Sequence, residues 1–159
     1  MTSLHQFASD IDKLERVQRR ATKLCTDLRD LSYKERLQNL KLPSLYYRRQ
    51  RGDMIQVYKI LTGRDNIHQD KLLPLSHSTR TRGHSLKLEK KFARLNIRKH
   101  SFGPRVVNSW NSLPTWVVEA KDMNDFKSKI DQFWKDRHYI TRPTHATSMF
   151  IRYERESQA

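Results

Sequence analysis

The chain has 159 residues, with 32 Lys or Arg against 17 Asp or Glu, a net charge of +15, and hydrophobic residues make up only 36%. Its mean hydropathy is -0.88, and no apolar run approaches the roughly 20 residues that span a bilayer, so no transmembrane helix is expected. The N-terminus lacks a secretory signal pattern and Cys25 is the single cysteine, which favours a reducing cytoplasmic or nuclear setting.

The first predicted element is an amphipathic helix of about five turns that starts at Ser9. Apolar residues recur there at steps of three and four, which is typical of one buried helix face. We expect Cys25 to be a small core residue at the edge of this face rather than a nucleophile. The apolar face consists of Ile11, Leu14, Val17, Ala21, Leu24 and Leu28.

Two further helices follow. Ser32 and Glu35 have the spacing of a capping box for a short helix, which should stop before Pro43. Ser44 is suited to cap a longer helix, whose end is expected at Gly63 because glycine readily adopts the left-handed conformation.

The third helix carries a basic cluster, Arg48, Arg49 and Arg51, directly after Tyr46 and Tyr47. Guanidinium groups beside aromatic rings suit phosphate contact and base stacking. A solvated helix face with two half-buried tyrosines is the alternative, and the cluster taken alone favours that alternative.

The helical period is lost between residues 64 and 100. The alternating segments SLKLE at 85–89 and FARLNIR at 92–98 predict a β-hairpin that turns at Lys90 and Lys91. Because an isolated hairpin is weak in water, helices should pack behind its apolar side chains, while the other face presents a comb of cations. Lysines also protect edge strands from aggregation without binding anything, so a structural role stays open. The apolar side chains are Leu86, Leu88, Leu95 and Ile97.

A pair of helices is expected next. Ser101 opens the first, with Pro104 in its first turn, and Trp110 is predicted to be a core residue because it follows two valines at helical spacing. The second, amphipathic helix starts near Asp122 and should pack on the first. Beyond Arg137 no period remains, so we expect a mobile tail.

Together these elements predict a mainly α protein, a small helical bundle with one short β-hairpin and a disordered C-terminal tail. The predicted division is a helical segment at 9–63, a basic loop and hairpin at 64–100, a helical pair at 101–136 and the tail at 137–159.

The positive charge is concentrated in the first part of the chain. Residues 1–114 hold 24 Lys or Arg against 10 acids, whereas residues 115–159 hold 8 against 7. Between Arg80 and Arg105 nine cations accompany a single acid, Glu89. Such a band predicts a surface that binds a polyanion.

Three segments carry a family resemblance: LERVQRRATKL at 14–24, LPSLYYRRQRGDMIQVYKIL at 42–61 and RVVNSWNSLP at 105–114. Their order and spacing over residues 10–136 resemble the C-terminal end of non-LTR, LINE-type (jockey-like) retrotransposon reverse transcriptases. The resemblance implies a thumb-like segment at 9–63 and its continuation, which grip template and primer while the upstream palm performs RNA-directed DNA synthesis.

The polymerase chemistry is not expected in this chain. It needs paired aspartates that hold two metal ions, and the sequence contains no Asp-Asp pair. A zinc site is not expected either, because His77, His84 and His100 are widely spaced and no CxxC or HxxxH pair occurs. We therefore predict no enzymatic activity, no catalytic residue, no metal and no cofactor.

The leading hypothesis is a nucleic-acid-binding fragment of such a reverse transcriptase that contacts RNA or DNA phosphates without reading the bases. The residues predicted to make these contacts are Arg48, Arg49, Arg51, Arg80, Arg82, Lys87, Lys90, Lys91, Arg94, Arg98, Lys99 and Arg105.

Two alternatives remain. The chain could be a helical protein-interaction module whose exposed apolar faces bind the missing palm or another protein, or self-associate. In that case, replacing Val106, Trp110 or Phe126 should abolish association, whereas reversing Arg94 and Arg98 should not. The other alternative is a truncated retroelement relic without function.

Overall fold

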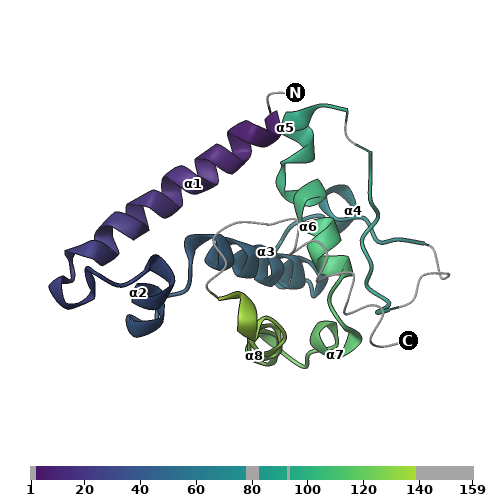
Figure 1. Ribbon diagram of the computed structural model, residues 1–159. Helices are drawn as coiled ribbons and strands as arrows, with labels where there is room; N and C mark the ends of the chain where they lie inside the picture. Colours follow the sequence, from purple (N-terminus) through teal and green to yellow (C-terminus); the bar gives the residue numbers. More distant parts are fainter. Residues whose placement is uncertain (1–2, 78–82, 93, 139–159) are drawn as a thin grey trace. The chain divides into compact units, whose positions relative to one another are not determined.

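The computed structural model describes residues 3–77, 83–92 and 94–138 (Figure 1). The fold is mainly helical, as predicted, whereas residues 139–159, where the mobile tail was expected, lie outside the described residues. Each helix in the described ranges is too short or too polar to cross a membrane. The described residues divide into two compact units: residues 3–49 with 136–138 belong to unit 1, and those between 50 and 135 belong to unit 2.

Unit 1 begins with a long helix followed by short turns. The predicted capping box of the second helix is confirmed, since the Glu35 amide donates to Ser32 Oγ at 3.3 Å and the Ser32 amide donates to Glu35 Oε2 at 2.7 Å. Ser44 also caps the third helix as predicted, accepting a hydrogen bond from the Tyr47 amide at 3.1 Å. The elements are α1 (Ser3–Ala21), the 3-10 turns η1 (Thr22–Leu24) and η2 (Thr26–Leu28), α2 (Tyr33–Asn39) and the start of α3 (Leu45–Leu61).

Helix α1 differs from its prediction in its start and in its buried face. It begins at Ser3 rather than Ser9, and the exposed fractions of Leu14 and Val17 are 59% and 65%. Cys25, expected in the core, is exposed between the two 3-10 turns. Among residues 10–21, whose side chains are described, the face that α1 buries is polar instead, and the most buried side chain is that of Glu15.

Glu15 is a polar hub that joins three helices of unit 1. The hydroxyl of Tyr33, at the start of α2, donates to Glu15 Oε1 at 2.6 Å, and the Tyr46 amide, in the first turn of α3, donates to Oε2 at 3.3 Å. Burial, together with the hydrogen bond to the Glu15 carboxylate, raises the pKa of Tyr33. Polar satisfaction, rather than apolar periodicity, therefore determines which face of α1 is buried.

Replacing Glu15 with alanine should lower the free energy of unfolding by about 2 kcal/mol, because a buried tyrosine hydroxyl and a helix amide lose their acceptor. Urea denaturation followed by circular dichroism measures this change. The control Glu15→Gln keeps one acceptor oxygen and should cost less. Equal stability of the alanine variant and the wild type would contradict the hub.

Unit 2 is built around the aromatic rings of three helices. Trp110 and Phe126 are fully buried with ring centroids 6.0 Å apart, and Tyr58 stacks on Phe126 at 4.3 Å. The predictions that Trp110 is a core residue and that the last helix packs on the helix that holds Trp110 are confirmed. Besides the rest of α3, the elements are α4 (Gln69–Leu72), α5 (Asn96–Lys99), α6 (Phe102–Asn111), α7 (Thr115–Val118) and α8 (Met123–Phe133). The 3-10 turn η3 (Lys135–Arg137) begins at the last residue of unit 2 and continues into unit 1.

The predicted β-hairpin is wrong. Leu88 forms an isolated antiparallel bridge with Leu75, and residues 96–99, expected in the second strand, form helix α5. The reason lies in α6: the side chain of Asn111 accepts from the Leu88 amide at 2.8 Å and donates to the Leu88 carbonyl at 2.9 Å. These two hydrogen bonds occupy the backbone groups that a second strand would need.

Candidate functional site

The twelve cations predicted to bind phosphate are distributed over both units. Arg48 and Arg49 belong to unit 1, and the others whose positions are described belong to unit 2. Arg80 and Arg82 lie outside the described residues. The site is therefore built from unit 2 alone.

Two of the predicted cations are engaged in bidentate ion pairs. Arg51 donates to both carboxylate oxygens of Asp131, at 2.5 and 2.7 Å, and joins α3 to α8. Arg105 donates to both oxygens of Asp53, at 3.1 and 2.8 Å, and joins α6 to α3. Two parallel hydrogen bonds between a guanidinium and a carboxylate fix the geometry of both partners. We therefore assign Arg51 and Arg105 to the helix packing of unit 2 and leave them out of the interface.

The tyrosines beside the first arginine cluster are packed into the protein. Tyr47 is 4% exposed and its ring centroid lies 4.4 Å from that of His138, while burial raises the pKa of Tyr46. Arg48 is exposed and Arg49 is half-buried. This arrangement favours the alternative reading of a solvated helix face over a stacking platform.

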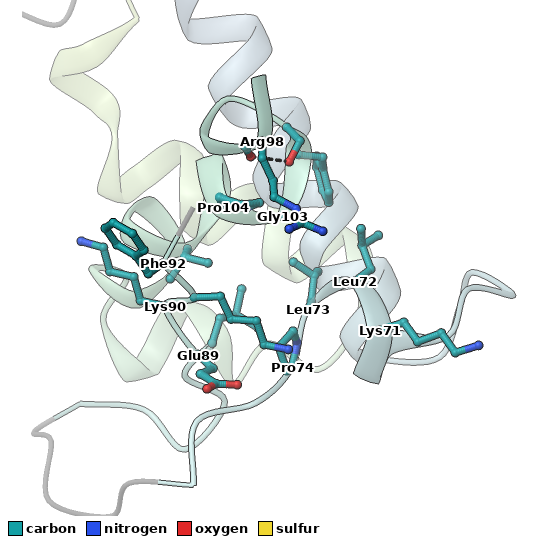
Figure 2. A pocket seen from close by; sticks show the side chains of 15 residues that line it. Lys71, Leu72, Leu73, Pro74, Glu89, Lys90, Phe92, Arg98, Gly103 and Pro104 are labelled. Atoms are coloured by element: carbon teal, nitrogen blue, oxygen red, sulfur yellow. Dashed lines mark hydrogen bonds between the residues drawn. The ribbon is translucent and has the colours of Figure 1, made fainter. Parts of the chain in front are cut away.

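Lys90, Lys91 and Arg98 come together around a hollow of about 410 Å³ in unit 2. Lys71, which the sequence analysis did not single out, adds a fourth cation to its lining. Figure 2 shows the Arg98 side chain directed toward Leu72 and Leu73, whereas Lys71 extends away from the hollow. The cations thus surround an apolar depression instead of forming the flat comb that the hairpin would have presented.

The floor of the hollow is apolar and well packed. Leu73, Leu88 and Val107 are 1%, 2% and 5% exposed, and Phe102 with Pro104 supplies the first turn of α6 as one wall. Ser101, the N-cap of α6, donates its hydroxyl to the Arg98 carbonyl at 2.7 Å, which ties α5 to the start of α6. These contacts hold the hollow on rigid elements.

We call Lys90, Lys91, Arg94 and Arg98 the cationic cluster. All four side chains are exposed, and within residues 83–92 and 94–138 none of them forms an ion pair. The one acid in the lining of the hollow is Glu89. The cluster therefore carries a positive charge that neighbouring carboxylates hardly reduce, and such a surface attracts polyanions.

Two further predicted cations in unit 2, Lys87 and Lys99, are not included in the cluster. Lys87 is half-buried, and its carbonyl accepts a hydrogen bond from the Ser76 amide at 2.7 Å beside the Leu75–Leu88 bridge. Lys99 is the last residue of α5. Lys87 does not line the hollow.

Large apolar side chains are exposed beside the cationic cluster. Phe92, Leu95 and Ile97 have exposed fractions of 90%, 70% and 88%, so the expectation that helices cover Leu95 and Ile97 is wrong. Phe92 also lines the hollow, a role that the sequence analysis missed. An aromatic residue directly after a lysine pair is the signal that could have identified it.

His84 is a buried titratable group near the core of unit 2. Its Nε2 lies 3.2 Å from the carbonyl oxygen of Trp110, and the two rings meet edge to face at 5.9 Å. Burial lowers the pKa of His84, since the charged form is poorly solvated there. His84 thus packs on Trp110. Groups of three His, Cys, Asp or Glu that could hold a metal ion are absent from the described part of the chain.

The stability of unit 2 should fall as the pH drops below the ordinary pKa of histidine, about 6.5. Because the pKa of His84 is lower in the folded state, the unfolded chain takes up the proton first and is favoured. The contribution of neutral His84 to the free energy of unfolding is fully present above pH 6.5. It is lost as the pH falls through the pKa that His84 has in the folded state. Urea denaturation at pH 7.5 and 5.5 measures this loss of stability. In the variant His84→Gln the loss should be smaller than in the wild type. An equal loss in the variant and the wild type would contradict the role of His84.

No protein-family model, curated protein or solved structure matches the chain. The resemblance to LINE-type reverse transcriptases therefore stays a prediction.

Proposed function

We propose that the chain binds the phosphate backbone of RNA or DNA through its cationic cluster, as part of a LINE-type reverse transcriptase. The observation that carries the proposal is a set of four exposed cations without ion-pair partners among the described residues, three of which, Lys90, Lys91 and Arg98, line an apolar hollow. The family resemblance supports the same class of ligand, because it implies a region that grips template and primer. This function places the protein in the cytoplasm or the nucleus.

The proposed role is positioning, without a catalytic step. Lysine ammonium and arginine guanidinium groups donate hydrogen bonds to phosphate oxygens and displace the counterions condensed on the strand. A paired aspartate motif for nucleotide addition is absent from the sequence. The chain would therefore hold a strand whose chemistry another domain performs.

A salt titration tests the proposal. Labelled 20-nucleotide RNA and DNA strands are titrated with the protein, and binding is followed by fluorescence anisotropy between 50 and 300 mM NaCl. If all four cations contact phosphates of a single strand, the slope of log affinity against log salt should be about -3. An affinity that stays constant over this range would overturn the proposal.

A protein-interaction module is the second candidate, and α1 is the observation in its favour. Leu14, Val17 and Leu24 are 59%, 65% and 83% exposed. The residues that the sequence analysis selected for association, Val106, Trp110 and Phe126, are wrong for this purpose, because they are almost fully buried in unit 2. Their replacement would unfold the protein instead of uncovering an interface.

The exposed residues of α1 provide the appropriate test. If this face binds a second copy of the chain, the wild type should sediment as a dimer, and Leu14→Lys with Val17→Lys should make it monomeric without changing nucleic-acid affinity. A monomeric wild type would contradict self-association. Reversal of Arg94 and Arg98 serves as the control that leaves the sedimentation unchanged.

A further inference from the structure

We infer that the hollow beside the cationic cluster accepts one unpaired nucleotide of a single strand, with its base against Phe92 and its phosphate on Arg98 and Lys91. The inference rests on the proposed function and goes beyond it, because phosphate binding alone does not distinguish single strands from duplexes.

The size and the lining of the hollow suit a nucleotide. Its volume of about 410 Å³ lies within the range typical of small-molecule sites, about 300 to 1,000 Å³. Leu73, Leu88 and Val107 form an apolar floor for a flat ring, and Lys90, Lys91 and Arg98 bring positive charge to the lining. A nucleotide has the matching distribution, since its base is largely apolar on both faces and its phosphate is charged.

Phe92 provides the surface for stacking. It lines the hollow although it is 90% exposed, so its ring faces are open to a ligand. Figure 2 shows its ring on the opposite side of the hollow from Leu72. Aromatic side chains beside cations are the combination by which proteins bind single strands, because bases stack on the ring while the cations hold the backbone.

The first turn of α6 adds to the electrostatics of this site. Gly103 and Pro104 line the hollow at the start of that helix, where the partial charge of the helix is positive. A phosphate bound by Arg98 would thus also be stabilised by the partial positive charge at the N-terminus of α6. The same site excludes a paired base, because a base inside a duplex cannot leave its stack without a cost of a few kcal/mol.

Phe92→Ala is the decisive variant, and Ile97→Ala is its matched control. Both side chains are exposed and follow one another closely in sequence, but only Phe92 lines the hollow. Affinities are measured by anisotropy for 12-nucleotide RNA and DNA single strands and for a blunt duplex of the same length. A 2-aminopurine base in the DNA strand reports stacking through the quenching of its fluorescence.

The inference predicts a loss of about tenfold in single-strand affinity for Phe92→Ala, together with loss of the quenching. Ile97→Ala should bind like the wild type, and duplex affinity should be equal for all three proteins. Equal losses in Phe92→Ala and Ile97→Ala, or unchanged quenching in Phe92→Ala, would overturn the nucleotide site but leave the proposed function standing. Absence of salt-dependent binding to any strand would instead overturn the proposed function.

Discussion

Reversing the four charges of the cationic cluster, with Lys90, Lys91, Arg94 and Arg98 changed to glutamate, is expected to weaken single-strand binding at least 100-fold in 100 mM salt. Each cation that neutralises a phosphate contributes about 0.7 to the salt slope for a single strand, so the slope should become nearly flat. The four side chains are exposed, and their replacement should leave the fold intact. Anisotropy titrations over a salt series measure both quantities, with circular dichroism as the check on folding.

A matched control distinguishes binding at the cationic cluster from electrostatic attraction by the net charge of the chain. The second variant reverses Arg16, Arg20, Lys23 and Lys34, which are also exposed. Both variants change the net charge of the chain equally, from +15 to +7, because each reversal removes two charges. The control should retain most of the affinity and slope. Equal losses in the two variants would show that net charge, and not the cationic cluster, governs binding.

Arg105 belongs to the basic band that starts at Arg80, but we expect it to contribute to stability and not to binding. Its guanidinium is held by Asp53 in the packing of α6 on α3, so Arg105→Ala should reduce stability without changing the salt slope. The sequence could not make this distinction, because a basic run looks the same whether its members face solvent or a carboxylate far along the chain. Asp53 lies 52 positions away from Arg105.

Local signals in the sequence predicted most of the helices. Capping at Ser32 and Ser44 depends on neighbouring residues alone, and so does the left-handed Gly63 at the end of α3, whose φ is 66°. Trp110 was placed correctly because its spacing from the preceding valines reflects a helix that packs on a core on one side.

The misplaced elements depend on contacts between distant residues. The hairpin prediction failed because Asn111 occupies the backbone groups of Leu88, and the buried face of α1 is set by Glu15 binding Tyr33. Neither contact can be predicted from periodicity, since both depend on hydrogen bonds between residues that are far apart in the sequence. The hollow was missed for the same reason: it forms only when α4, the segment around Leu88 and the start of α6 meet.

Gly103 lies where the start of α6 packs closely against the end of α4. Replacing it with alanine is expected to destabilise unit 2. A Cβ atom at this position would lie 2.9 Å from the backbone carbonyl oxygen of Leu72, closer than carbon and oxygen atoms can pack without a shift of the backbone. Alanine normally stabilises a helix by up to about 1 kcal/mol relative to glycine, so the clash must overcome a favourable term. We expect a net loss of about 2 kcal/mol.

Gly52 is the matched control, because it lies within helix α3 and a Cβ there would meet nothing within 4 Å among the described residues. Gly52→Ala should therefore raise the free energy of unfolding by about 0.5 to 1 kcal/mol, opposite in sign to Gly103→Ala. Urea denaturation of both variants measures the difference. Since Leu72 and Gly103 both line the hollow, Gly103→Ala should also weaken single-strand binding, whereas Gly52→Ala should not. Stabilisation by both substitutions would show that α4 does not pack against α6 at this distance.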